Sequence, residues 1–141
     1  MKTKIYERLE NRILIADGAM GTMLQAAGLP IGACPEEWNI THPEVVTSIH
    51  RAYFDAGCDF VLTNTFGGNR SRLAHFGFEG RVREFNQAGA RIAVGTKPAR
   101  GFVGGSVGPT GEFLEPFGTF TFEMLVDVFT EQISALVEGG V

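Results

Sequence analysis

Three short apolar runs recur along the chain, and each is followed by glycine and small polar residues. They cover residues 13–16, 60–63 and 102–107. Their apolar positions are nearly continuous rather than alternating, which is typical of parallel strands that are covered on both faces. The pattern therefore predicts three buried strands of a parallel sheet.

Amphipathic helical patterns occupy the segment before the second run and the segments after the second and third runs. In residues 44–57 the apolar positions share one helix face. Thr41 and Glu44 have the spacing of a capping box at the start of this helix, and Gly57 is placed to end it. A second helix is predicted over about residues 80–96, and its inward positions are Val82, Phe85, Gly89, Ile92 and Ala93. The last helix is closed by glycines 139 and 140, and its predicted apolar face comprises Phe122, Leu125, Val126, Phe129, Ile133, Leu136 and Val137.

The order of these elements indicates an α/β protein built from right-handed βαβ units. A doubly wound sheet and a TIM (β/α)8 barrel both fit this order. A TIM barrel has about 250 residues, so 141 residues correspond to its N-terminal part, about three β/α units. Because a bare parallel strand edge is a liability, we expect residues 1–141 to be truncated before the fourth strand, with a natural short protein as the alternative.

Composition and charge exclude several classes of protein. The chain is 44% hydrophobic and carries a net charge of -4, so no basic surface for nucleic acid or an anionic membrane is expected. No apolar run is long enough to span a membrane or to serve as a secretory signal. Two cysteines do not form a disulfide framework, which favours a cytoplasmic setting. Phosphate-loop motifs are missing, which argues against the nucleotide-binding, doubly wound alternative.

Metal-ligand motifs are missing as well. The cysteines and histidines, which are Cys34, His42, His50, Cys58 and His75, form neither a C-x-x-C nor an H-E-x-x-H pattern. We expect His50 to have a packing or surface role and Cys58 to be a small buried residue. The sequence therefore predicts no metal site within this chain.

The predicted strand ends carry the candidate binding residues. Asp17 follows the first apolar run and precedes a glycine-rich turn, and residues 63–66 and 106–111 follow the other two runs. In parallel α/β sheets these ends form the active face. Asp17 could there bind a substrate ammonium, or it could cap the next helix. The segments contain no general base and no Ser/His/Asp set, so no catalytic residue is predicted; Trp38 is expected to pack in a loop.

These segments resemble the homocysteine S-methyltransferase family, and most closely the N-terminal homocysteine-binding module of cobalamin-dependent methionine synthases. The resemblance extends in order and spacing over nearly the whole chain. The motifs that carry it are DGAMGT at residues 17–22, HPEVV at 42–46, IHRAYF at 49–54, AGCD at 56–59, TNTF at 63–66, GPTG at 108–111 and ALVEGG at 135–140.

The resemblance implies a (β/α)8 barrel that transfers a methyl group to the thiol of homocysteine and so produces methionine. It implies a zinc ion held by three cysteine thiolates, which lie beyond Val141, and a methyl donor such as methylcobalamin or methyltetrahydrofolate, with cobalamin carried on another domain or protein. The resemblance places the substrate-binding residues at Asp17 for the ammonium, Gly18, Ala19 and Met20 for the carboxylate, and Asn64 and Thr65 as the pocket lining.

The resemblance also limits what this chain is expected to do by itself. Without the zinc cysteines the isolated chain is expected to be an incomplete and inactive enzyme. The alternative is a non-catalytic half-barrel that binds an amino acid or associates with a partner chain, including self-association through its open barrel edges.

Overall fold

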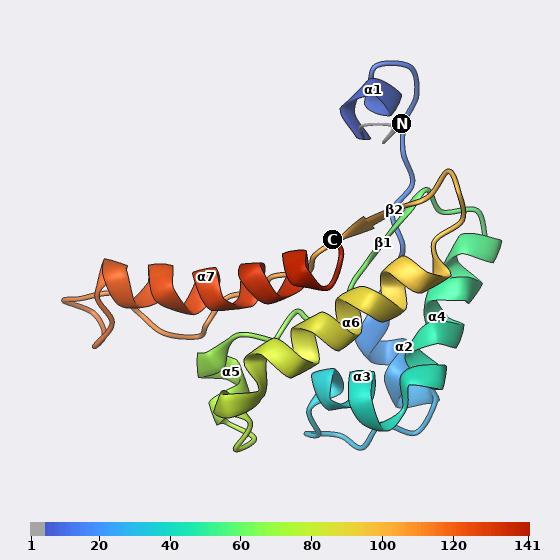
Figure 1. Ribbon diagram of the computed structural model, residues 1–141. Helices are drawn as coiled ribbons and strands as arrows, with labels where there is room; N and C mark the ends of the chain where they lie inside the picture. The colour runs from blue at the N-terminus through green and yellow to red at the C-terminus, as the bar shows by residue number, and fades with distance from the viewer. Residues whose placement is uncertain (1–4) are drawn as a thin grey trace.

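The computed structural model describes residues 5–141, which form a small parallel sheet with helices packed along it (Figure 1). Strands β1 (Phe60–Leu62) and β2 (Phe102–Gly104) pair in parallel, with Phe60 opposite Phe102. The three long helices are α4 (Pro43–Asp55), α6 (Val82–Thr96) and α7 (Phe122–Glu138). This βαβ arrangement agrees with the predicted α/β class, and the three helices begin and end close to their predicted bounds.

The first predicted strand forms only a single bridge. Ala16 pairs in parallel with Phe60, and the Asp17 N–H donates to the Phe60 carbonyl at 3.0 Å. Ile13 and Ile15 are 88% and 60% exposed, so the prediction of a buried strand over residues 13–16 is wrong. The physical reason is that among residues 5–141 no further strand or helix covers this segment, and an apolar run without a covering layer is not buried.

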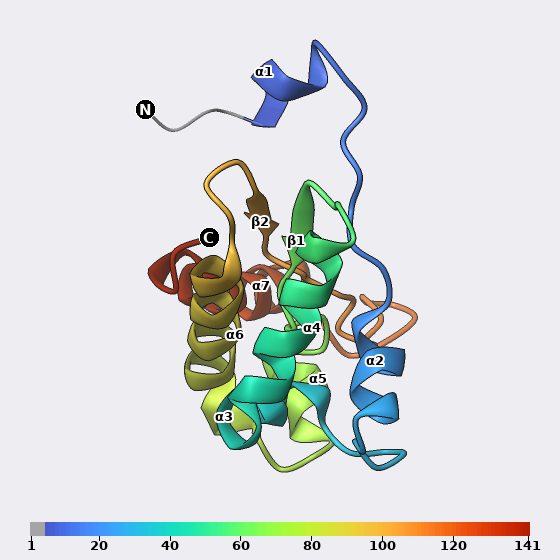
Figure 2. The same cartoon turned by 90° about the vertical axis from the view of Figure 1, so that its right-hand side faces the viewer.

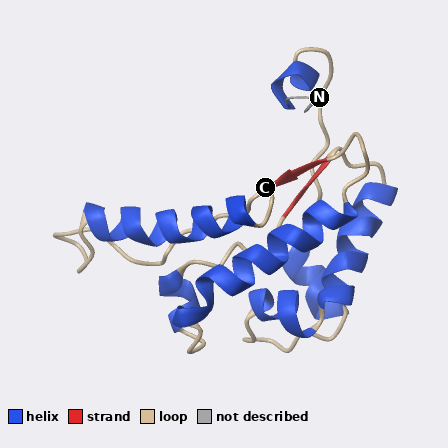
Figure 3. Ribbon diagram, viewed as in Figure 1, coloured by secondary structure: helices blue, strands red, loops and turns tan. Residues whose placement is uncertain are grey.

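Short helices fill the connections between the long elements, and the sequence patterns did not predict them (Figure 3). One of them contains Trp38, which was expected in a loop and is instead a buried helical residue. These short elements are α1 (Ile5–Leu9), α2 (Met20–Ala26), η1 (Pro35–Glu37), α3 (Trp38–Thr41), α5 (Arg70–Ala74) and η2 (Glu79–Arg81).

The start of α4 differs from the predicted capping box. Its N-cap is His42, and no side chain caps the helix there. The Thr41 hydroxyl donates to the Glu37 carbonyl at 3.2 Å, because Thr41 is the last residue of α3 and satisfies a carbonyl one turn back. The predicted end of the helix is confirmed by Gly57, whose φ of 101° is a conformation that favours glycine.

Helix α6 lies between α4 and α7, as two perpendicular views show (Figures 1 and 2). Its predicted inward residues are buried, apart from the half-buried Ile92. Helix α7 packs closely on α6. A Cβ at Gly139 would lie only 2.4 Å from the Ala90 Cβ, so glycine allows this close approach. Two apolar clusters form the core, one of Leu24, Leu29, Trp38, Val46 and Ile49 and the other of Cys34, Leu73, Val82 and Phe85.

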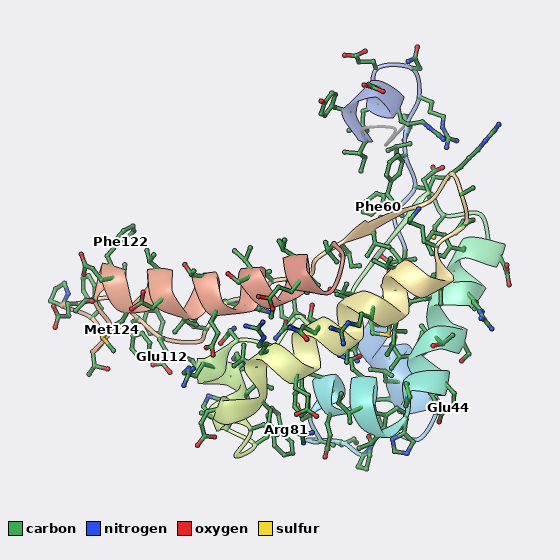
Figure 4. The ribbon with its side chains drawn as sticks, in the orientation of Figure 1. Glu44, Phe60, Arg81, Glu112, Phe122 and Met124 are labelled. Atoms are coloured by element: carbon green, nitrogen blue, oxygen red, sulfur yellow. The ribbon has the colours of Figure 1, made fainter. Side chains whose placement is uncertain are left out.

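The buried face of α7 only partly matches the predicted one, since Leu136 is buried and Leu125 and Phe129 are half-buried as part of it. Its buried residues are Val128, Gln132, Ala135 and Leu136, whereas Phe122 and Val137 are more than half exposed. Figure 4 shows Phe122 and Met124 at the end of α7 that extends away from α6. The helix has apolar residues on two sides, and α6 covers only one of them. Among the helices of the described chain, none is long and apolar enough to cross a membrane.

Candidate functional site

A pocket of about 480 Å³ lies where β1 and β2 end. All six residues that the sequence predicts for substrate binding line it, which are Asp17, Gly18, Ala19, Met20, Asn64 and Thr65. The structure thus brings together two segments that are more than forty residues apart. Phe66 and Ser106, from the predicted strand-end segments, line it too, and the lining residues that the sequence did not single out include Pro35, Glu36, Arg72 and Phe76.

The Asp17 carboxylate is fixed in the pocket wall by the backbone of β1. Its Oδ2 accepts a hydrogen bond from the Leu62 N–H at 2.9 Å. Burial raises the pKa of Asp17 above its ordinary value, and the hydrogen bond from Leu62 opposes this shift. The N-cap of α2 is Ala19, which has no side-chain cap, so Asp17 does not serve as a helix cap. The carboxylate retains acceptor capacity for a ligand.

The turn at residues 18–20 is held from the side by α4. The Tyr53 hydroxyl donates to the Ala19 carbonyl at 2.9 Å. A Cβ at Gly18 would lie 3.0 Å from the Tyr53 hydroxyl oxygen, so glycine allows the close approach of this side chain. Sequence patterns place Tyr53 on the apolar face of the helix and do not reveal that its hydroxyl orders the turn.

The Asn64 side chain forms structural hydrogen bonds beneath the pocket. Its Nδ2 donates to the Pro35 carbonyl at 2.8 Å and to Asn39 Oδ1 at 3.1 Å. Asn39 Nδ2 in turn donates to the Asn64 carbonyl at 2.8 Å. Asn64 is only 4% exposed. Its amide therefore joins the end of β1 to η1 and α3 and shapes the pocket floor.

The Thr65 side chain is equally engaged. Its hydroxyl donates to the Ser106 carbonyl at 2.8 Å and lies 2.6 Å from the Thr63 hydroxyl. The Ser106 N–H donates to the Thr63 hydroxyl at 2.9 Å. These bonds continue the contact between β1 and β2 past the ends of the strands. Thr65 is completely buried, so it contributes to the site by fixing the two loops.

Three helical elements hold the backbone of the loop at residues 64–68. Gln132 Nε2 of α7 donates to the Thr65 carbonyl at 2.7 Å, and Asn86 Nδ2 of α6 donates to the Gly68 carbonyl at 2.7 Å. The Gly67 N–H donates to Glu36 Oε1 at 2.6 Å. Gln132 and Asn86 are buried polar residues on helix faces that are otherwise apolar, and that interruption is the one sequence signal that could have identified them.

The open side of the pocket has an aromatic and cationic rim. Phe66 is 62% exposed and Phe76 is 37% exposed, and the exposed Arg72 lies beside them. The Phe66 carbonyl accepts from the Gly108 N–H at 2.9 Å. A Cβ at Gly108 would lie 2.5 Å from that carbonyl oxygen, so the glycine of the GPTG segment lets the two loops meet.

The cysteines and histidines do not gather at this pocket. Across residues 5–141 no group of three or more Cys, His, Asp or Glu side chains could hold a metal ion. Burial raises the pKa of Cys34 to about 12, and its thiol lies 3.4 Å from Glu36 Oε2 as a donor. Cys58 is half-buried, and burial raises the pKa of its thiol. His50 is completely buried, in agreement with a packing role.

Comparison with known proteins decides the family. The profile of the family described as "Homocysteine S-methyltransferase" matches residues 14–141. The chain belongs to the homocysteine S-methyltransferase family. Methionine synthases of Mycobacterium tuberculosis and Mycobacterium leprae are 38% and 37% identical to it, over 98% of this chain and 12% of their own length.

Solved structures of a homocysteine methyltransferase share the fold. The homocysteine methyltransferase MmuM from Escherichia coli superposes in its metallated form with a TM-score of 0.79 at 22% identity, over 96% of this chain and 54% of that chain. Its oxidized form gives 0.78 at 24% identity, over 94% and 52%. This member of the homocysteine S-methyltransferase family therefore spans about half the length of MmuM and about an eighth of the methionine synthases.

Proposed function

We propose that this chain supplies part of the homocysteine site of an enzyme that transfers a methyl group to the homocysteine thiol and produces methionine. The observation that carries the proposal is the placement of Asp17 in the pocket at the ends of β1 and β2, in a chain that belongs to this family. The pocket has the volume range typical of small-molecule sites. Homocysteine is a zwitterion, and a half-buried carboxylate is a suitable partner for its ammonium.

The binding step follows from the groups that line the pocket. The Asp17 carboxylate accepts hydrogen bonds from the ammonium, and its bond from Leu62 keeps it oriented. The turn at residues 18–20, ordered by Tyr53, faces the carboxylate of the substrate. Asn64 and Thr65 keep the floor of the pocket rigid. Rigid positioning of this kind is what brings a thiol and a methyl donor into reacting geometry.

The family resemblance also implies zinc, which would make the homocysteine thiolate available at neutral pH. The part of the chain that the structure describes does not offer a set of ligands for it. We therefore place the zinc cysteines, and the contacts to a cobalamin-bound methyl group, in other parts of a complete (β/α)8 barrel enzyme.

A second candidate function is association with a complementary chain, including a second copy of this one. Two features favour it. Helix α7 exposes the apolar side chains of Phe122, Ile133 and Val137, and β1 pairs with β2 in a sheet of two strands, which leaves one edge of β2 without a strand neighbour among the described residues. Exposed apolar surface and open strand edges are common sites of association.

The proposed activity is tested by product formation. The natural polypeptide that carries this sequence is incubated with zinc, homocysteine and either methylcobalamin or methyltetrahydrofolate, and methionine is measured by mass spectrometry. The proposal expects methionine that depends on homocysteine and zinc. No methionine with either donor, together with no calorimetric binding of homocysteine, would contradict it. Binding without turnover would instead favour the non-catalytic amino-acid-binding alternative.

A further inference from the structure

The loop that joins β2 to α7 exposes large apolar side chains. In this segment, residues 112–121, which we call the aromatic loop, Phe117 is 90% exposed and Phe113 is 71% exposed. The loop is held in shape by its own backbone, because the Phe117 and Gly118 N–H groups both donate to the Leu114 carbonyl at 3.0 Å. Aromatic side chains that an ordered loop holds in contact with water are typical of an interaction surface.

The charged side chains of this part of the chain are all acidic. Residues 101–141 contain no lysine, arginine or histidine. Glu112 and Glu115 of the aromatic loop are exposed, and within residues 5–141 neither forms an ion pair. The cation that reaches α7 from α5 is Arg70, which is already paired with Glu131. The loop therefore presents apolar and negative groups together, without a cation to balance them.

A second surface of the chain has the opposite character. A basic cleft of about 420 Å³ lies between α6, β2 and the residues that follow α7, and its apolar lining includes Phe102. Its cations are Arg8, Lys97 and Arg100; none of them forms an ion pair within residues 5–141, and no acidic side chain lines the cleft. The Arg8 guanidinium already lies over the Phe102 ring, 5.8 Å from its centre. An apolar floor with a cationic rim is the complement of the aromatic loop.

The two surfaces lie at opposite ends of α7. The aromatic loop leads into its first residue, Phe122, whereas Gly140 and Val141 of the basic cleft follow its last (Figure 1). Figure 4 shows Glu112 and Phe122 together at the end of α7 that is far from the cleft. The 17 residues of α7 span about 25 Å. The helix thus keeps the loop and the cleft of one chain apart, and they can meet only between two chains.

We propose that the aromatic loop of one chain docks in the basic cleft of a second copy, with the Phe117 ring on the apolar floor and Glu112 and Glu115 facing Lys97 and Arg100. This inference specifies the surfaces of the second candidate function, on which it rests, and is independent of the homocysteine site. Each chain offers one loop and one cleft, so the contact is head-to-tail and can repeat. Burial of the ring supplies affinity, and the opposite charges fix the orientation.

The test reverses the charges of the two surfaces and measures the association of the 15.3 kDa chain by analytical ultracentrifugation over a range of concentration. The loop variant carries Glu112→Lys and Glu115→Lys, and the cleft variant carries Lys97→Glu and Arg100→Glu. Glu44→Lys is the matched control, because Glu44 is an exposed acid on α4, away from both surfaces (Figure 4). Circular dichroism of each variant reports whether it is folded.

The proposal expects the loop variant and the cleft variant each to associate at least about tenfold more weakly than the wild type, because like charges then face each other at the contact. An equimolar mixture of the two variants restores opposite charges across the contact and should associate as the wild type does. Phe117→Ala, which truncates a ring that is 90% exposed, should leave the fold intact and weaken association by about tenfold. Glu44→Lys should leave association unchanged.

Losses in the two charge variants without recovery in the mixture would overturn the inference, and so would an equal loss in Glu44→Lys. Wild-type association of both variants, with loss in Ile133→Lys, would place the contact on the exposed face of α7; this inference would fail and the second candidate function would stand. A monomeric wild type would overturn both. If a charge variant does not fold, Phe117→Ala decides, and its association at wild-type strength would overturn the inference.

Discussion

Asp17→Asn is the substitution that most sharply separates a ligand contact from a structural residue. Asparagine preserves the size of the side chain and an oxygen that can accept the Leu62 N–H, whose present bond is 2.9 Å. Since α2 has Ala19 at its N-cap, the substitution does not alter a helix cap. The pocket is therefore expected to keep its shape and to lose one negative charge.

The magnitude follows from the burial of Asp17. Loss of one member of a buried charge pair costs about 2–5 kcal/mol, and the half-buried position of Asp17 favours the lower end of this range. About 2 kcal/mol corresponds to a roughly 30-fold increase in the homocysteine Kd. Burial raises the pKa of Asp17, so its protonation, and the loss of its charge, begins at a higher pH than for an exposed aspartate. Wild-type affinity should fall as the solution is acidified through that pKa, and the affinity of Asp17→Asn should change less.

The assay is a homocysteine titration of wild type and Asp17→Asn over a range of pH, with thermal unfolding measured in parallel. Asp55→Asn is the control, because Asp55 is an exposed acid at the end of α4, away from the pocket. A Kd for Asp17→Asn within about twofold of the wild-type value would refute the assignment. A large loss of thermal stability would show that Asp17 supports the fold instead.

Three further predictions concern stability and association. His50 is buried without a hydrogen-bond partner among the described residues, and burial lowers its pKa to about 4. Between pH 6.5 and 4 only the unfolded chain gains the His50 proton, so the free energy of unfolding should fall by about 3 kcal/mol as the pH is lowered over that window. Urea titrations of His50→Leu should lack this fall. Gln132→Leu leaves the Thr65 carbonyl without its side-chain donor; it should cost about 1–3 kcal/mol in a thermal melt and weaken homocysteine binding, and an unchanged melt would contradict the role given to this side chain. Light scattering of the 15.3 kDa chain should give the mass of an associated species, and Ile133→Lys should lower that mass toward the mass of one chain. A monomeric wild type would exclude self-association.

The long helices could be predicted from sequence because their periodicity is a local property. The apolar spacing in α4 and α6 reports directly which residues face a neighbour. For α7 the same reasoning was only partly right, because Leu136 is buried as predicted whereas Ile133 and Val137 are exposed, and packing against α6 decides which apolar positions are buried. The run at residues 13–16 has the composition of a strand, but a strand also needs neighbours to cover it.

The pocket could be located from sequence only in part. Asp17 was identified because strand ends meet at one edge of a parallel sheet. The network beneath the pocket could not be identified, since the bond from Gln132 to Thr65 joins residues 67 positions apart. Tyr53 reads as an apolar-face residue until its hydroxyl is seen against the Ala19 carbonyl. Likewise Glu36 has no motif, and only its burial beside the cavity draws attention to it.

A crystal structure of the natural polypeptide with bound homocysteine would test the central claim most directly. The account predicts that homocysteine lies in the pocket at the ends of β1 and β2, with its ammonium within hydrogen-bond distance of the Asp17 carboxylate and its carboxylate against the turn at residues 18–20. Homocysteine bound elsewhere, or bound in this pocket with its ammonium directed away from Asp17, would contradict the account.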